Sequence, residues 1–262
     1  MRRLLTFACQ GATLGATLDG GSGATGLLMV TGGSQTRIGS HRMYERLATA
    51  LAAEGIPALR FDRRGVGDSE GEDPGFRGSA PDIAAAAEAL RREGDVARIV
   101  GFGLCDGATA LALHGAAAGI HDVILVNPWL AEAEADSPAP AAIRRHYRDR
   151  LLSREGWTKL LSGSVSLGKL FAGLRKSTQT DSSELAAQVA GALRANRLRV
   201  ELILAETDAT AVAAAHELKH KQFKGLIAKS QTISSNSHTF ARPGDAEALL
   251  AATRAALRRS GA

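Results

Sequence analysis

The chain has 262 residues, of which 45% are hydrophobic and only 4% aromatic, and its formal net charge is +5. This length suits a single α/β domain with a large buried core, and the scarcity of aromatic residues argues against an aromatic-rich binding surface. Two cysteines, Cys9 and Cys105, provide no disulfide framework, so we expect a reducing compartment and a cytoplasmic protein. The sequence contains no run of about 18 apolar residues, so we expect no membrane span.

Predicted strands and helices alternate along most of the chain. The short apolar N-terminus is interpreted as a first strand and not as a signal peptide, because no small-residue cleavage site follows it. Strands are expected at residues 4–8, 12–18, 26–31, 56–61, 99–102, 123–126, 198–205 and 225–233. Helices are expected at residues 44–54, 82–92, 106–113, 211–219 and 246–259. This alternation predicts a mostly parallel central sheet covered by helices on both faces.

One segment interrupts the alternation. Residues 132–140 are acidic and contain prolines, and residues 141–195 are helical in pattern without a clear strand. We therefore expect one domain over 1–262 with a helical cap inserted at about 132–196. Residues 142–178 carry nine basic and two acidic side chains, which fits either a solvated helical face or a basic surface that attracts an anionic substrate or carrier. Nucleic-acid binding is not expected, because no aromatic interleaving or known motif accompanies this charge.

Residues 103–107, with the sequence Gly-Leu-Cys-Asp-Gly, lie between a predicted strand and an Ala/Leu-rich helix. The pattern is that of a G-x-S-x-G nucleophile elbow with cysteine in the serine position. Gly103 and Gly107 would let the strand and the helix approach closely, and the helix N-terminus would favour a thiolate at Cys105. The alternative is a buried, unreactive cysteine, since free cysteines are often core residues.

A cysteine nucleophile needs a base and an acid that orients the base. After a nucleophile elbow the acid comes next in the chain and the histidine comes last. Asp208 follows a predicted strand, and His238 lies in a polar loop between the last strand and the last helix. Both positions are carboxyl ends of strands, where open α/β sheets bind ligands. Glu206 is the rival acid, and Asn127 and Asp136 are more distant alternatives.

An acyl-transfer reaction also needs donors for the oxyanion. The backbone N–H of Asp106, directly after the cysteine, is the expected first donor. The second is expected from the loop after the third strand, at Ser34 or Gln35. Arg37 and His41 follow this loop and are expected to line the entrance to the site.

The glycine-rich stretch 62–71 is expected to be structural. It resembles a phosphate loop but lacks the G-x-x-x-x-G-K-[ST] spacing. The seven histidines are scattered along the chain, so we expect no metal site, and nothing in the sequence implies an organic cofactor.

Three stretches together resemble the α/β-hydrolase superfamily over nearly the whole chain: residues 61–69 (Phe-Asp-Arg-Arg-Gly-Val-Gly-Asp-Ser), the Cys105 elbow and the loop 237–240. This resemblance implies an α/β-hydrolase fold with a triad of Cys105, Asp208 and His238. Most members of the superfamily have serine as the nucleophile. In having cysteine the chain is similar to dienelactone hydrolases, although the rest of the sequence does not resemble theirs.

More narrowly, residues 31–41, 103–107 and 127–129 resemble the exosortase A system-associated hydrolase 1 group. That resemblance implies a context in bacterial exopolysaccharide and protein-sorting systems and supplies no substrate.

Two classes of function follow from these observations. The first is a hydrolase that cleaves an ester or thioester through an acyl-enzyme on Cys105, with an acyltransferase as its nearest variant. Its partner would be a small-molecule acyl substrate, with an anionic or carrier-linked one left open. The second is a non-catalytic binding protein on a hydrolase fold. The reactivity of the Cys105 thiol distinguishes the two.

Overall fold

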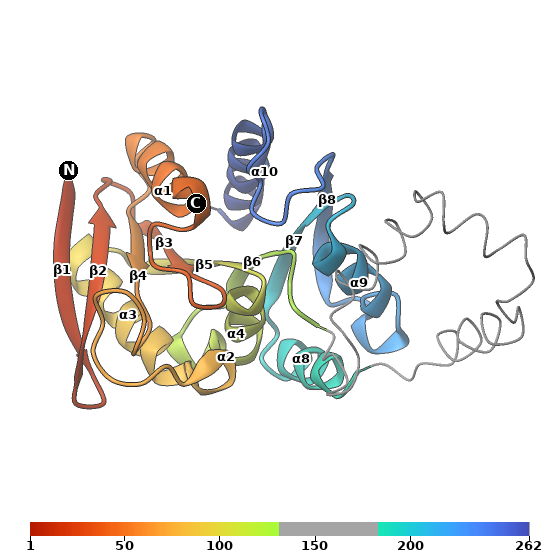
Figure 1. Cartoon of the computed structure of the whole chain (residues 1–262), viewed down its shortest axis with the longest axis horizontal. Coiled ribbons are helices and arrows are strands. Elements are labelled where there is room, and N and C mark those ends of the chain that lie inside the picture. The colour runs from red at the N-terminus through yellow and green to blue at the C-terminus, as the bar shows by residue number, and fades with distance from the viewer. Residues whose placement is uncertain (131–182, 262) are drawn as a thin grey trace, which may run out of the picture.

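The computed structural model describes residues 1–130 and 183–261 (Figure 1). Its strands are β1 (Arg2–Cys9), β2 (Ala12–Asp19), β3 (Thr25–Val30), β4 (Ala58–Phe61), β5 (Arg98–Leu104), β6 (Asp122–Val126), β7 (Arg199–Ala205) and β8 (Ile227–Ile233). They form one sheet in the order β1-β2-β4-β3-β5-β6-β7-β8. Strand β2 pairs antiparallel with β1 and β4, and every pair from β4 to β8 is parallel. The mostly parallel sheet predicted from the sequence is confirmed.

Helices cover both faces of this sheet. They are α1 (Met43–Ala53), α2 (Gly75–Gly78), α3 (Ala80–Gly94), α4 (Asp106–His114), α8 (Glu184–Ala195), α9 (Ala209–Glu217) and α10 (Asp245–Ser260). Short 3₁₀ helices lie at η1 (Ser40–Arg42), η2 (Ala116–Ala118) and η3 (Lys221–Phe223). The longer helices and all the strands lie close to their expected bounds, whereas α2 and the 3₁₀ helices were not expected.

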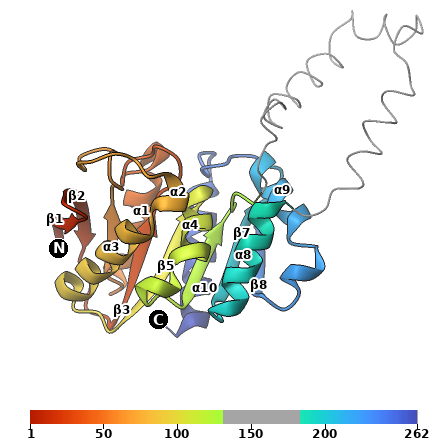
Figure 2. The same cartoon turned by 90° about the horizontal axis from the view of Figure 1, so that it is seen from below.

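The core has two layers, one on each side of the sheet. Helices α1 and α10 pack on one face, and α3, α4, α8 and α9 pack on the other (Figures 1 and 2). Strand β5 contributes side chains to both layers, because successive side chains of a strand point to opposite faces of the sheet. Val100 and Phe102 lie in the layer of α1 and α10, and Ile99 lies in the other.

Helix α8 overlaps the C-terminal end of the expected insertion at 132–196. Ser183 caps the N-terminus of this helix: its hydroxyl oxygen accepts a hydrogen bond from the N–H of Ala186 at 3.1 Å. Leu185, Val189 and Leu193 recur every fourth residue and are buried in the core. These residues therefore belong to the helices that flank the sheet. The remainder of the expected cap, with the basic stretch 142–178, lies outside the described residues.

The strand order reverses beside β3. The chain passes from β3 to β4 on one side and then crosses to β5 on the other. Val30, the last residue of β3, is paired with Gly103 of β5. The loops after β3 and β5 therefore leave the sheet side by side, at the kind of reversal point where open α/β sheets bind ligands.

The stretch 62–71 is a closed structural loop, as expected. Asp62 is fully buried, and its carboxylate accepts the N–H of Arg37 at 2.5 Å and that of Asp68 at 3.2 Å. The guanidinium of Arg37 pairs with Asp62 and also reaches the Asp68 carboxylate at 2.6 Å. The expectation that Arg37 lines an entrance is therefore wrong, because these contacts hold it in the scaffold.

Among the helices of the described residues, none has the length and apolar character required to cross a membrane.

Candidate active site

Cys105 sits at a sharp turn between β5 and α4. Its backbone angles are φ 58° and ψ −127°, a strained conformation for a residue with a side chain. Such a conformation persists only where the surrounding structure enforces it, and here the Cys105 N–H is held by the carbonyl of Val126 at 3.0 Å. The side chain of Cys105 remains partly exposed. The thiol is therefore presented at the tip of the strand–turn–helix unit.

The two glycines of the elbow are required by close backbone approaches. A Cβ on Gly103 would lie 2.6 Å from the carbonyl oxygen of Gly107, and one on Gly107 would lie 2.5 Å from that of Val30. Real Cβ atoms do not tolerate such contacts with backbone. The sequence-based explanation for both glycines is therefore confirmed.

Asp208 and His238 meet at the same edge of the sheet. Asp208 caps the N-terminus of α9, where its Oδ2 accepts the N–H of Ala211 at 2.9 Å. The same oxygen lies 3.0 Å from Nδ1 of His238, which lies in the loop between β8 and α10. Cys105 lies close enough to the His238 side chain to raise the pKa of the ring. The structure thus brings together the three side chains predicted from the sequence, from the ends of β5, β7 and β8.

The hydrogen bonds change the ionisation of this acid and base. The hydrogen bond with Asp208, followed by the interaction with Cys105, raises the pKa of His238 to about 10, against the opposing effect of burial. Burial works to raise the pKa of Asp208, but the hydrogen bonds from His238 and the Ala211 N–H outweigh it and the pKa is lowered. Both shifts favour an ionised pair at neutral pH.

Asn127 braces the histidine loop from the end of β6. It is fully buried with φ 42°, and its Nδ2 donates to the carbonyl oxygen of His238 at 3.0 Å. Its Oδ1 accepts the N–H of Ala205, at the end of β7, at 2.8 Å. From the sequence Asn127 was only a distant alternative for the acid. The available signal was an asparagine directly after a buried strand, since asparagine tolerates positive φ better than most residues.

Glu206, the rival acid, is not part of this cluster. The Glu206 carboxylate accepts the hydroxyl of Ser234 at 2.8 Å in an exposed hydrogen bond. Asp136 lies outside the described residues. Among the candidates that the structure describes, Asp208 alone contacts the His238 ring.

The loop after β3 supplies a backbone N–H to the elbow, but not the expected one. The N–H of Gln35 donates to the carbonyl of Gly32 at 3.3 Å within the loop, which corrects the expectation for Gln35. The N–H of Gly33 instead donates to Oδ1 of Asp106 at 2.6 Å, while Ser34 is exposed beside it. Asp106 opens α4, where a backbone N–H has no acceptor within the helix. The Gly33 N–H therefore points at the first residue of α4, whose own N–H is one of those without an acceptor in the helix.

A buried arginine supports this loop. Arg63 is 1% exposed, donates from Nη2 to the carbonyl of Gly33 at 2.5 Å and lies 3.6 Å from a carboxylate oxygen of Asp73. Its Nε and Nη1 have no hydrogen-bond partner among the described residues. A buried cation therefore lies against the Gly33 carbonyl. No pattern in the sequence indicates this role for Arg63.

A cavity of about 250 Å³ adjoins the histidine loop. His41, which was expected near the entrance, lines it together with Phe240, two residues after His238. Arg46 and Arg242 line it together with the carboxylate of Glu247, and leucines of α1 and α10 supply its apolar part.

Comparison with known proteins gives one family. The model of the alpha/beta hydrolase family matches residues 27–252 of the chain. No curated protein sequence matches it.

Several solved structures are similar over almost their full length. The α/β hydrolase GrgF from Penicillium sp. sh18 is 17% identical, with 99% of this chain and 98% of that one covered and a TM-score of 0.64. The esterase Pf2001 from Pyrococcus furiosus is 15% identical, with 99% and 91% covered and a TM-score of 0.68. A dienelactone hydrolase from Anabaena variabilis is 16% identical, with 98% and 95% covered and a TM-score of 0.62. At these identities the likeness shows the fold, and the match to the family model, which spans most of the chain, shows that the chain belongs to the α/β hydrolase family.

Proposed function

We propose that the protein hydrolyses an ester or a thioester through an acyl-enzyme formed on Cys105. The observation that carries this proposal is the hydrogen-bonded pair Asp208–His238 next to Cys105, which sits at a strained elbow. A thiol nucleophile suits thioesters and activated esters better than amides. The hydrogen bond with Asp208 raises the pKa of His238 to about 10, and an imidazolium beside Cys105 would favour a thiolate as the nucleophile.

Acylation then needs no prior proton removal from the thiol. The Cys105 thiolate attacks the carbonyl carbon and forms a C–S bond. The carbonyl electrons move to oxygen and return as the bond to the leaving group breaks. His238 gives its Nε2 proton to the departing alkoxide or thiolate, and Asp208 holds the ring in place through Nδ1. The products of this half-reaction are acyl-Cys105, neutral His238 and a free alcohol or thiol.

Deacylation restores the pair. Neutral His238 takes a proton from a water molecule, and the resulting hydroxide attacks the acyl carbon. The tetrahedral intermediate collapses by breaking the C–S bond, which regenerates the Cys105 thiolate beside the His238 imidazolium. The carboxylic acid product loses its proton to solvent. The sum of the two half-reactions is hydrolysis with water as the only co-reactant.

The oxyanion would be held by the backbone N–H groups of Asp106 and Gly33. Since the Asp106 carboxylate accepts the Gly33 N–H in the structure, it must move aside as the substrate carbonyl enters. The Arg63 guanidinium holds the Gly33 carbonyl and so fixes the peptide plane between Gly33 and Ser34 in this loop.

An anionic acyl substrate is supported by Arg46 and Arg242, which line the neighbouring cavity. A context in a bacterial exopolysaccharide or exosortase system is part of the proposal and rests only on the resemblance of residues 31–41, 103–107 and 127–129 to that group.

Acyl-enzyme trapping tests the proposed function. The protein is mixed with short p-nitrophenyl esters and acyl thioesters, quenched in acid, and analysed by intact and peptide mass spectrometry. We expect turnover and an acyl adduct on Cys105 that hydroxylamine removes. Cys105→Ala should lose both, and the matched variant Cys9→Ala should keep both, because Cys9 is buried beside Asp82 and far from the elbow in sequence and fold. Turnover that persists in Cys105→Ala would contradict the proposal.

A further inference from the structure

A second cluster of reactive side chains lies at the other end of α9. The sequence His-Glu-Leu-Lys-His occupies residues 216–220, and α9 ends at its glutamate, Glu217. The N–H of Lys219 donates to the carbonyl of His216 at 3.2 Å, and that of His220 donates to the carbonyl of Glu217 at 3.1 Å. These three-residue hydrogen bonds tighten the chain relative to an α-helix. The His220 ring consequently lies over the His216 ring, with 5.7 Å between centroids and 76° between planes.

The tightened turn brings three potential metal ligands together. One nitrogen from each imidazole and a carboxylate oxygen of Glu217 all lie within 4.8 Å of one another. Ligand atoms that share one zinc ion at 2.0–2.2 Å lie about 3.4 Å apart in a tetrahedral site. The remaining difference is small enough for side-chain rotation to close. His216 is exposed and His220 is half-buried, so both rings have room to rotate.

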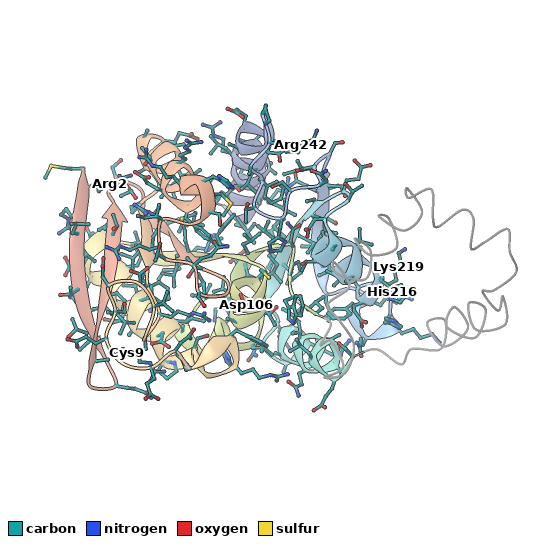
Figure 3. All side chains as sticks on the ribbon, in the orientation of Figure 1. Arg2, Cys9, Asp106, His216, Lys219 and Arg242 are labelled. Atoms are coloured by element: carbon teal, nitrogen blue, oxygen red, sulfur yellow. The ribbon has the colours of Figure 1, made fainter. Side chains whose placement is uncertain are left out.

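The electrostatic setting contains both favourable and opposing charges. The C-terminal end of α9 carries the negative end of the helix dipole, and Glu217 adds a carboxylate that is only 8% exposed. Lys219 and Lys221 oppose a cation, but both are exposed, so water and salt screen their charges. Figure 3 shows His216 and Lys219 at the edge of the molecule, away from Asp106 at the elbow.

We infer that His216, Glu217 and His220 bind one divalent transition-metal ion, for which zinc has the best-matched chemistry. Zinc accepts imidazole nitrogen and carboxylate oxygen together, and three protein ligands leave one position for water. Calcium and magnesium prefer all-oxygen sites, which excludes them here. The inference does not depend on the hydrolase activity.

The site differs from the H-E-x-x-H site of zinc peptidases. In that motif one continuous helix carries both histidines, and the glutamate acts as a base. Here the helix stops at Glu217, and the glutamate oxygen lies among the imidazole nitrogens as a ligand. The ion would fasten the turn between α9 and η3. Since Asp208 caps the N-terminus of α9, the metal site and the proposed catalytic acid lie at opposite ends of one helix.

From the sequence no metal site was expected, because the histidines are scattered. His216 and His220 were treated as separate helical positions. The turn that brings the two rings together depends on where the helix ends. The sequence pattern predicted that end at residue 219, whereas α9 ends at Glu217.

Zinc binding by the tag-free, chelator-treated full chain tests the inference, with zinc chloride as the probe. The side chains of Cys105, Asp208 and His238 are also capable ligands, so every titration is run in both the parent protein and Cys105→Ala. We expect a single equivalent of zinc to bind in either background, at a concentration where magnesium does not compete. His216→Ala and His220→Ala should each weaken binding at least tenfold. His121→Ala, which removes an exposed histidine elsewhere, should leave it unchanged.

Two further readouts separate loss of the site from loss of the fold. Zinc should raise the Tm of the parent and leave that of His216→Ala unchanged, while the metal-free Tm values of the two agree, because ligands that bind only the folded state stabilise it. Cobalt bound in place of zinc should show d–d absorption without a thiolate charge-transfer band. Absence of stoichiometric binding, binding that survives His216→Ala and His220→Ala, or binding that disappears in Cys105→Ala would each overturn the inference.

Discussion

Two polar networks at the carboxyl edge of the sheet each pair a buried carboxylate with a basic side chain, but they leave different groups exposed. In the loop 62–71, the fully buried Asp62 accepts two backbone N–H groups and pairs with Arg37, whose guanidinium is also engaged by Thr17 and Asp68. In the other network, Asp208 pairs with His238, whose side chain is 31% exposed and also contacts Cys105. The first network is closed on itself, whereas the second leaves a base and a thiol available to a substrate.

Backbone strain separates the two regions in the same way. Positive φ in the structural loop is carried by glycines such as Gly65 and Gly67, which adopt it at little cost. Around the candidate site it is carried by Cys105, Asn127 and Phe240, at 58°, 42° and 53°. Strain in residues with side chains tends to persist at functional sites, where the surrounding structure enforces it. The difference supports the proposal that the network of Cys105, Asp208 and His238 is the catalytic one.

The largest expected effect comes from removing the reacting groups. Cys105→Ala and His238→Ala should each lower kcat/KM by about 10⁴-fold or more, since residues of a triad act as a unit. The Tm should change little, because neither side chain fills the core. Steady-state kinetics and thermal unfolding of each variant measure the two effects. A kcat/KM near that of the parent in either variant would contradict the assignment of Cys105 and His238 as the reacting groups.

Asp208→Asn should lower kcat/KM by about 10³–10⁴-fold. Asparagine also caps helices, so its oxygen can still accept the Ala211 N–H and α9 should remain intact. The same oxygen then faces Nδ1 of His238, as it does in Asp208, but without the negative charge that holds the imidazolium in place. Kinetics alongside far-UV circular dichroism checks this, and Asp208→Ala serves as the comparison that loses the cap as well.

Asp62→Asn should lower the stability of the protein and leave its kcat/KM almost unchanged. Removing the buried charge leaves Arg37 with only the exposed Asp68 carboxylate, so the free energy of unfolding should fall by about 2–4 kcal/mol. The kcat/KM per folded molecule should stay within about twofold of the parent. Urea denaturation provides the measurement. The exposed pair Arg254–Glu54 provides a control, since Glu54→Gln should have too small an effect to detect.

The smallest effect concerns the carboxylate that accepts the Gly33 N–H. Asp106→Asn should raise kcat/KM about fivefold, because a like charge about 4 Å from the oxyanion costs about 1 kcal/mol even in a water-like environment. Asparagine keeps an acceptor for Gly33, so the loop should not change. The rise should shrink at high salt if charge is its cause, and a fall in kcat/KM would indicate that the carboxylate itself assists the reaction.

Features that depend on chain order and residue type could be predicted from the sequence. Alternating apolar runs gave the sheet and its helices, and the spacing of Gly103 and Gly107 about Cys105 gave the elbow. The positions of Asp208 and His238 followed from strand ends, because parallel strands deliver their carboxyl ends to one edge of the sheet.

Features that depend on local backbone direction could not be predicted. The second oxyanion donor was expected at Ser34 or Gln35 and not at Gly33, because the sequence does not show which N–H groups are hydrogen-bonded within the turn after β3. Arg37 was assigned to the entrance because its partner Asp62 is distant in sequence. The support that Asn127 gives to His238 spans 111 positions and arises only from the order of strands in the sheet.

The pH dependence of Cys105 alkylation by iodoacetamide, followed by peptide mass spectrometry, tests the central claim most directly. The raised pKa of His238 means that its positive charge is present throughout the neutral range and is lost only as the pH rises through about 10. Labelling of the parent should therefore be fast at about pH 6 and nearly constant to about pH 9. In His238→Ala it should be slow at about pH 6 and rise about tenfold per pH unit toward the ordinary thiol pKa of about 8.5. Slow labelling of the parent that follows the same rise would mean that Cys105 and His238 do not form an activated pair.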